Sequence, residues 1–145
     1  MSTRGSRILL VEDNPAEEAL TLMAIAEAQV DRDVDVARDG AAALDHLLDG
    51  ERALPGFVLL DLRLPKIGGL ELVRRVRQHE RTRLVPLVIL TNSREEHDLV
   101  AAYANGANSY LRKPVNFDVF TETMRQICSY WLELNETPPD GHLTG

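Results

Sequence analysis

The strongest constraint on the fold is an apolar run from Phe57 to Leu60 that ends directly in an acidic residue, Asp61. Four consecutive apolar residues followed closely by Pro65 are typical of a strand buried on both faces, and such strands belong to parallel sheets covered by helices. An unpaired carboxylate is costly to bury, which indicates that Asp61 ends the strand. Taken alone, Asp61 is interpreted as a strand end that turns to water. At the carboxyl edge of a parallel sheet it would lie where open α/β folds place their active sites.

Four further segments have the composition of strands, and helical patterns separate them. The predicted strands are residues 7–11, 33–37, 86–90 and 109–112. Asn14 and Pro15 predict the start of the first helix, with Glu17 placed to complete a capping box, and this helix is expected to run to about residue 29. Asn92 or Ser93 is the expected cap of the helix that follows the fourth strand. The last helix is expected to begin near residue 116.

Five strands alternating with five helices predict a doubly wound α/β domain with right-handed crossovers. For a chain of this size the expected strand order is 2-1-3-4-5, that of flavodoxin-like folds. This order makes the first and third strands neighbours. It brings Glu12 and Asp13 to the same edge as Asp61, while Thr91 and Lys113 end the next strands along the sheet.

Composition limits the number of domains and the kinds of partner. A chain of 145 residues with 44% hydrophobic residues is long enough for one domain, expected over residues 5–134, with a disordered tail at 135–145. A net charge of −7 argues against a nucleic-acid surface and against an anionic membrane as partners. The single cysteine, Cys128, excludes a disulfide framework, and without a signal peptide the expected compartment is the cytoplasm.

The carboxylates expected at this edge indicate a metal site. Glu12, Asp13 and Asp61 would repel one another, and a divalent cation is the simplest way to hold them together. Oxygen ligands without His or Cys favour a hard ion, and so few of them favour Mg²⁺ over Ca²⁺. The backbone carbonyl of Arg63 could supply a further ligand. A bound ion would let a phosphoryl group approach, and Asp61 could then act as a nucleophile.

Thr91 and Lys113 fit the same chemistry. A lysine supplies a point charge to a phosphoryl oxygen, and a threonine hydroxyl can donate a hydrogen bond to another. Each is a weak signal alone, since a threonine at a strand end commonly forms a turn and a lysine before a proline commonly lies in a loop. Their joint occurrence with Asp61 and the acidic pair is what favours a phosphoryl-transfer site.

On these motifs the sequence resembles the response-regulator receiver family over nearly its whole length. The matching residues are Glu12-Asp13, Asp61 with Leu64-Pro65 and a following glycine, Thr91 after an apolar strand, and Lys113-Pro114. The resemblance implies a signalling protein rather than an enzyme. It implies that Asp61 accepts a phosphoryl group from a histidine kinase, with Mg²⁺ held by Asp13, Asp61 and the Arg63 carbonyl, and with Glu12 acting through water.

The same resemblance implies a conformational switch. Tyr110 matches the family's switch aromatic, which is expected to turn inward as Thr91 moves toward the phosphoryl group; a statically packed tyrosine is the alternative. The Lys113–Pro114 bond is expected to be cis, as is common in the family. Asn92 and Arg63 depart from the usual small or neutral residues beside the site, and either could change the access of water or of a phosphodonor.

Shorter motifs are similar to those of receivers paired with phytochrome-type histidine kinases. These are Leu90-Thr91-Asn92-Ser93, Lys113-Pro114-Val115 and Tyr130-Trp131. The similarity implies a light-sensing kinase as partner and a homodimer through the last helix. Because Trp131 and Leu134 are expected to extend beyond the sheet, they are predicted, with Tyr130, to form a partner surface.

Three alternatives remain beside the phosphoacceptor. A receiver-like interaction module would use the fold without phosphorylation. A haloacid-dehalogenase-type phosphatase also uses an aspartate nucleophile, Mg²⁺, a threonine and a lysine, but needs a second aspartate where this chain has Arg63. A flavodoxin-like electron carrier needs a phosphate-binding first loop, and Glu12-Asp13 would repel a phosphate there.

Overall fold

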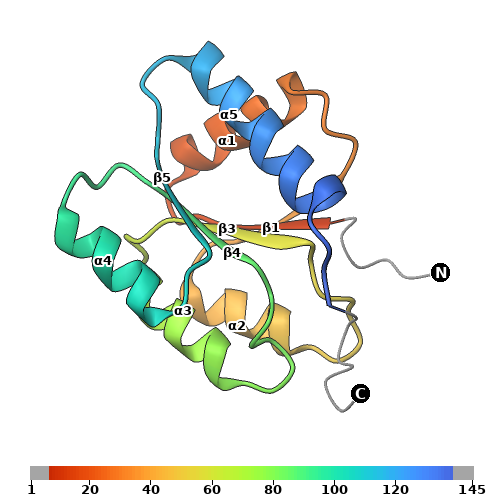
Figure 1. The fold of residues 1–145 in the computed structure, drawn as a ribbon, viewed down its shortest axis with the longest axis vertical. Coiled ribbons are helices and arrows are strands. Elements are labelled where there is room, and N and C mark those ends of the chain that lie inside the picture. The colour runs from red at the N-terminus through yellow and green to blue at the C-terminus, as the bar shows by residue number, and fades with distance from the viewer. Residues whose placement is uncertain (1–6, 139–145) are drawn as a thin grey trace.

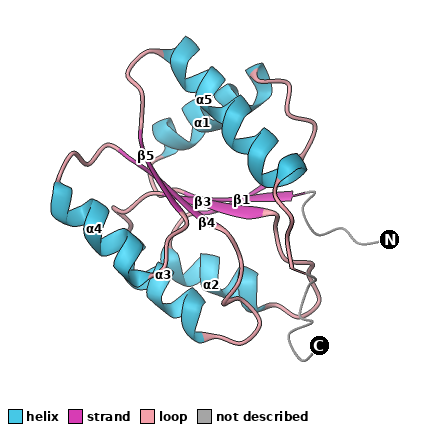
Figure 2. Ribbon diagram, in the orientation of Figure 1, coloured by secondary structure: helices cyan, strands magenta, loops and turns pink. Residues whose placement is uncertain are grey.

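A computed structural model describes residues 7–138 of the chain as a parallel sheet with helices on both faces (Figures 1 and 2). The strands are β1 (Arg7–Val11), β2 (Asp33–Ala37), β3 (Phe57–Leu60), β4 (Leu87–Thr91) and β5 (Ser109–Arg112). The helices are α1 (Pro15–Glu27), α2 (Gly40–Leu48), α3 (Gly69–Gln78), α4 (Glu96–Asn105) and α5 (Phe117–Ser129). The five-stranded sheet has the order β2-β1-β3-β4-β5, so the predicted fold class and strand order are confirmed.

Two apolar layers, one on each face of the sheet, make the core. Figure 1 shows α1 and α5 on one face and α2, α3 and α4 on the other. Successive side chains of β3 alternate between the layers: Phe57 and Leu59 pack toward α1 and α5, and Val58 and Leu60 pack toward the other three helices. All four are almost completely buried. The apolar run therefore forms the central strand that its composition predicts.

The register of the sheet decides which strand ends meet. Val11 of β1 pairs with Leu60 of β3, so the residues that follow them, Glu12 and Asp61, lie at the same edge. The Asp61 amide donates to the Val11 carbonyl at 3.3 Å, which holds the two strand ends together. On the other side, the Lys113 amide donates to the Thr91 carbonyl at 2.8 Å. The chain therefore converges on one edge at four successive strand ends.

The helix caps confirm some local predictions and correct others. Asn14 caps α1 by accepting from the Ala16 and Glu17 amides, and Asn116 caps α5 through the Val119 amide. The predicted capping box at α1 is wrong, because the Glu17 carboxylate binds Lys113 instead.

The predicted cap of α4 is also wrong, since this helix begins at Glu96 with Glu95 at the cap. Ser93 is held outside the helix, where its amide donates to the Thr91 hydroxyl and its carbonyl accepts from the Arg112 guanidinium. These bonds keep residue 93 in the loop after β4, and the helix starts later than propensity suggests.

The end of the last helix differs from the regular apolar stripe predicted for it. After α5, residues Tyr130–Leu134 form a π-helical turn, in which one extra residue per turn rotates the following side chains. Residues 135–138 have no regular secondary structure, and the rest of the predicted tail lies outside the described residues. Over residues 7–138, none of the helices has the length and apolar character needed to cross a membrane.

Candidate functional site

Asp61 ends β3 and begins a loop that folds tightly back on itself. Its Oδ1 accepts a hydrogen bond from the Arg63 amide at 3.0 Å, which fixes the orientation of the carboxylate. The loop closes where the Gly69 amide donates to the Leu62 carbonyl at 3.0 Å. A Cβ atom at Gly69 would lie 2.6 Å from the Asp61 carbonyl oxygen, so only glycine allows this approach. The glycine noted in the sequence thus has a definite role in placing Asp61.

Lys113 binds Asp61 from the end of β5. Its Nζ donates to Asp61 Oδ2 at 3.1 Å, to Glu12 Oε1 at 3.2 Å and to Glu17 Oε1 at 2.9 Å. The lysine side chain is only 6% exposed, so these bonds are made away from bulk water. One ammonium therefore meets three carboxylates from three different elements, β1, α1 and β3.

Thr91 contacts the other oxygen of Asp61. The threonine is fully buried, and its hydroxyl donates to Asp61 Oδ1 at 3.3 Å. The same hydroxyl accepts from the Ser93 amide at 3.2 Å, and Ser93 Oγ in turn donates to the carboxylate of Asp98 on α4. A continuous set of hydrogen bonds thus joins Asp61 to the first turn of α4.

The charges at this edge are unbalanced. Burial raises the pKa of Glu12, and the nearby Asp61 adds to the effect, while Lys113 and the Asn14 amide oppose it. Burial would lower the pKa of Lys113, but its hydrogen bonds and charge interactions with Glu17, Asp61 and Glu12 outweigh burial and raise it. Burial is the main cause of the Glu12 shift, and the carboxylate partners are the cause of the Lys113 shift.

The predicted metal ligands are chemically suited to a hard divalent ion. Glu12, Asp61 and the Arg63 backbone follow β1 and β3 directly, and Asp13 is exposed in the turn between β1 and α1. All of them offer oxygen atoms. In the structure, one oxygen of Glu12 and one of Asp61 face Lys113, and across residues 7–138 no group of three His, Cys, Asp or Glu side chains is arranged to hold an ion.

Pro114 requires a correction. The structure has no cis peptide bond among its described residues, so the Lys113–Pro114 bond is trans and the predicted cis bond is wrong. Trans is the intrinsically favoured isomer before proline, and with this bond Lys113 already reaches Asp61.

Tyr110 lies on β5 and packs against the core layer that contains α2, α3 and α4. Its hydroxyl is buried and, within residues 7–138, has no hydrogen-bond partner. The ring is therefore inward in this structure. An unsatisfied buried hydroxyl destabilises the arrangement that leaves it so, and a conformation that gave it a partner would relieve this cost.

The three residues predicted as a partner surface lie at the far end of the last helix, away from Asp61. Trp131 is half-buried and packs on the core layer under α1 and α5, with the Tyr130 ring edge-on to it at 4.8 Å between centroids. Tyr130 is 47% exposed and Leu134 is 71% exposed. The structure thus separates two exposed residues from one that belongs mainly to the core.

The model of the response regulator receiver domain matches residues 8–125, which include all of the strand residues except Arg7 and every predicted residue around Asp61. The chain belongs to the response regulator receiver domain family. The resemblance inferred from the strand ends is thereby confirmed, and the receiver domain family is a family of signalling modules.

Similar proteins include both named regulators and solved structures. The chain is 45% identical to the probable methanogenesis regulatory protein FilR2 of Methanothrix harundinacea, over 90% of this chain and 86% of that protein. It is 36% identical to the response regulator Rcp1 of Synechocystis sp., over 90% of this chain and 92% of Rcp1.

The structure of the Mn²⁺-bound form of Rcp1 matches with a TM-score of 0.80 and 35% identity, over 92% of this chain and 99% of that one. The phosphorylated cyanobacterial phytochrome response regulator RcpA matches with a TM-score of 0.83 and 31% identity, over 92% and 98%. The receiver domain described here is thus close to regulators associated with phytochromes.

Sequence reasoning missed Glu17 as a member of the site. Its place in the first turn after Asn14 suggested only a helix cap. The available signal was its position on a helix that starts at the carboxyl edge of the sheet, one turn beyond Glu12-Asp13. A contact with Lys113, 96 positions away in the chain, was not visible without the fold.

Proposed function

We propose that this receiver domain is a cytoplasmic phosphoacceptor switch in which Asp61 takes a phosphoryl group from the phosphohistidine of a sensor histidine kinase. The observation that carries the proposal is the contact of Lys113 and Thr91 with different oxygens of Asp61, at 3.1 and 3.3 Å. These are the two donors that a phosphoryl group on Asp61 would need.

In the proposed transfer, an Asp61 oxygen forms a bond to phosphorus while the bond from phosphorus to the histidine nitrogen breaks, and the nitrogen keeps the electron pair. Lys113 and Thr91 then donate to oxygens of the transferred group. The Arg63 amide keeps hold of Asp61 Oδ1 and so limits the motion of the nucleophile. The chain in this way assists its own phosphorylation, and attack of water on the same phosphorus would reverse the state.

We propose Mg²⁺ as the metal, held by Asp13, Asp61 and the Arg63 carbonyl, with Glu12 binding through water. When bound, it would neutralise the carboxylates and the phosphoryl oxygens. The oxygen-only donor set supports this choice, and so does the metal in the Mn²⁺-bound structure of Rcp1.

The test is incubation of the protein with Mg²⁺ and acetyl phosphate, followed by intact-mass measurement. We expect the mass of one added phosphoryl group, stable in acid and lost in base. Asp61→Asn and a sample in which a chelator has removed the divalent ions are expected to show no addition. Equal labelling of Asp61→Asn would overturn the assignment. No labelling of the wild type by acetyl phosphate or by a phosphorylated kinase would favour an interaction module that works without phosphorylation.

For the kinase, we propose a phytochrome-type photosensor. Similarity to Rcp1 and RcpA supports this choice. The higher identity to FilR2, whose name refers to methanogenesis, favours a different sensor as the second candidate. The test compares phosphoryl transfer from a purified phosphorylated phytochrome kinase with transfer from an unrelated kinase. A rate well above that of the unrelated kinase would support the phytochrome-type partner.

We further propose a homodimer through the end of the last helix. The exposure of Tyr130 and Leu134 supports it, since large apolar residues in water favour a protein contact. Leu134→Glu is expected to lower the molecular mass measured by light scattering while leaving the far-ultraviolet circular dichroism spectrum unchanged. Val100→Glu, at a residue 61% exposed on α4, is the matched control. An unchanged mass for Leu134→Glu would exclude this end of the helix as the interface.

A further inference from the structure

All the donors of Lys113 are already used in the structure. An ammonium group has three N–H donors, and Glu12, Glu17 and Asp61 each accept one of them. A phosphoryl oxygen can therefore bind Lys113 only if one carboxylate leaves. The identity of the carboxylate that leaves determines what the incoming phosphodonor must overcome.

Glu17 is the carboxylate best able to leave. The Glu12 side chain is 4% exposed, and its second oxygen accepts from the Asn14 amide at 3.2 Å, so it is held on both sides. Asp61 is the proposed acceptor itself. The Glu17 side chain is 33% exposed, and water can replace Lys113 as its partner at little cost.

Glu17 also lies beside Lys113 at the surface of the molecule. Together with Lys113 it lines a groove whose other walls are apolar or neutral. The remaining lining residues are Leu20, Asn92, Pro114, Val115, Phe117 and Phe120. Within the described residues 7–138, Glu17 is the only acidic residue lining this groove, so an anion that binds there beside Lys113 meets the Glu17 carboxylate.

The charge around Lys113 favours one class of donor. Glu12, Glu17 and Asp61 contact its one ammonium and Asp13 follows Glu12 in the chain, so these four carboxylates keep a surplus of negative charge even with a divalent ion. A small dianionic donor meets this surplus directly. A donor with a cationic group beside its phosphoryl group can pair with Glu17 when Lys113 leaves it.

We propose that Glu17 is a specificity-determining residue: it holds Lys113 in the resting site and discriminates against small dianionic phosphodonors in favour of donors that carry a positive charge next to phosphorus. A protonated imidazole on a phosphohistidine is such a donor. The inference rests on the proposed phosphoacceptor function and adds to it the class of substrate that the site accepts.

The chain contains a matched control for Glu17. Glu18 is the next residue on α1 and carries the same charge, but its carboxylate accepts from the Arg38 guanidinium at 3.0 and 3.1 Å instead of from Lys113. Glu17→Gln and Glu18→Gln therefore remove the same charge from the same helix. Only the first removes a partner of Lys113.

The first experiment measures the second-order rate constant of Asp61 labelling with two donors in excess Mg²⁺. Acetyl phosphate is a dianion at neutral pH, and phosphoramidate carries an ammonium group on phosphorus. Glu17→Gln is expected to raise the constant for acetyl phosphate about fivefold and the constant for phosphoramidate much less, with Glu18→Gln near wild type. An equal rise for both donors, an equal rise in both variants, or no rise with acetyl phosphate would overturn the proposal.

The second experiment needs no phosphoryl transfer. Titration calorimetry is expected to show Mg²⁺ binding to Glu17→Gln about threefold weaker, and binding of beryllium fluoride in the presence of Mg²⁺ about threefold tighter, than to Glu18→Gln. A structural defect would weaken the binding of both Mg²⁺ and beryllium fluoride. If the two affinities changed in the same direction, the proposed role of Glu17 would be overturned. If the wild type is labelled by no donor, the phosphoacceptor function fails, and the opposite shifts alone still decide whether Glu17 controls anion access.

Discussion

Two cations held at opposite ends of the strands, Lys113 and Arg77, have opposite kinds of partner. Lys113, at the carboxyl edge, donates to three carboxylates. Arg77, at the amino edge, donates to four neutral oxygens at 2.7–3.0 Å, and these are the carbonyls of Arg83, Val85 and Gly106 and the side-chain oxygen of Asn108. Burial lowers the pKa of Arg77. Burial would also lower the pKa of Lys113, but the acidic partners of Lys113 outweigh it and raise this pKa. The comparison separates a cation used for structure from one held among surplus charge.

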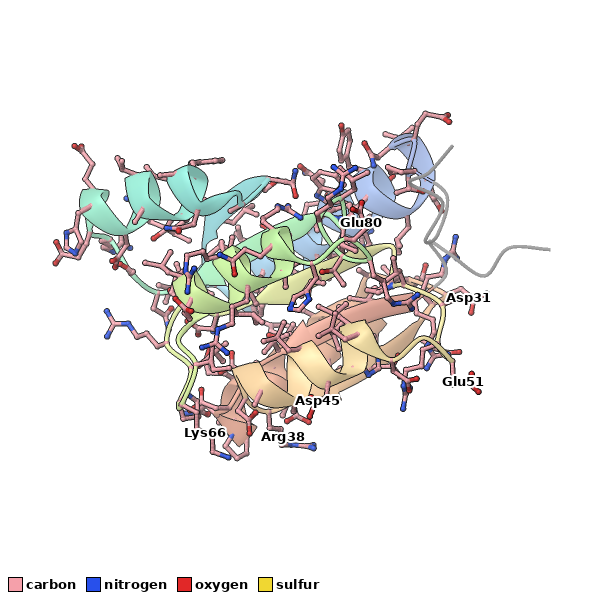
Figure 3. All side chains as sticks on the ribbon, turned by 90° about the horizontal axis from the view of Figure 1, so that it is seen from below. Asp31, Arg38, Asp45, Glu51, Lys66 and Glu80 are labelled. Atoms are coloured by element: carbon pink, nitrogen blue, oxygen red, sulfur yellow. The ribbon has the colours of Figure 1, made fainter. Side chains whose placement is uncertain are left out.

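Other charged residues at the two ends of the strands show the same difference in how well their charges are paired. Figure 3 shows Lys66, which follows β3, at one end of the molecule, and Asp31 and Glu51, which precede β2 and β3, at the other. At the amino end, Arg7 pairs with Asp35 at 2.6 and 2.9 Å, and Arg81 donates to three carbonyls. At the carboxyl end, burial of Glu12 beside Asp61 leaves an unfavourable charge that Lys113 offsets only in part, since the pKa of Glu12 is still raised. Functional sites commonly keep such unfavourable charge, and the satisfied edge supplies the stability that offsets it.

The largest expected effect comes from replacing the two cations by methionine. Lys113→Met leaves buried carboxylates without their cation and is expected to lower the free energy of unfolding at pH 7 by about 3 kcal/mol and to slow Asp61 labelling about 100-fold. Arg77→Met leaves carbonyls without donors and is expected to cost about 2 kcal/mol without affecting labelling. Urea denaturation and intact-mass kinetics measure the two quantities.

The pH dependence distinguishes the two variants. Without Lys113 the pKa of Glu12 rises further above its unfolded value. A carboxyl group with a raised folded pKa loses stability as pH rises through that value, so the deficit of Lys113→Met is expected to shrink between pH 7 and pH 5. The deficit of Arg77→Met is expected to stay constant, since its partners do not titrate. Parallel pH profiles would contradict the division between the two edges.

The same substitution is expected to have opposite effects at the two edges. Asp61→Asn removes one of the carboxylates crowded around Lys113 and is expected to raise the free energy of unfolding by about 1 kcal/mol while abolishing labelling. Asp35→Asn removes a carboxylate paired with Arg7 and is expected to lower the free energy of unfolding by about 1 kcal/mol. Changes of the same sign in thermal and urea unfolding would remove the basis of the comparison.

The smallest expected effect is the pH dependence of the contribution that Asp35 makes to the free energy of unfolding. The hydrogen bond and charge of Arg7 lower the pKa of Asp35 below its ordinary value of 3.8. A depressed carboxyl pKa contributes stability above the unfolded value and loses it as pH falls through the folded value. Because His46 lies 3.5 Å from Asp35 and also titrates, the comparison is made in a His46→Gln background. There, the difference that Asp35→Asn makes is expected to be constant from pH 7 to pH 5 and to disappear in strong acid. A difference that grows toward acid pH in urea titrations would refute the pairing.

Much of the fold and the centre of the site could be predicted because the relevant signals are local. The run from Phe57 to Leu60 is buried on both faces, as its composition requires. Asp61, Thr91 and Lys113 each follow an apolar strand, and parallel strands bring their carboxyl ends to one edge. The prediction failed where tertiary contacts outweighed local preference, as at Ser93, whose amide and carbonyl are both bonded in the loop before α4.

The sequence by itself determined the α/β class, the strand order and the convergence of Asp61, Thr91 and Lys113, because alternation, apolar runs and strand ends are properties of short segments. Only the tertiary structure decided how the charges pair. It placed Glu17 on Lys113 instead of in a helix cap, made the Lys113–Pro114 bond trans, and turned the end of the last helix into a π-helical turn. These outcomes depend on groups far apart in the chain competing for the same donor or the same space.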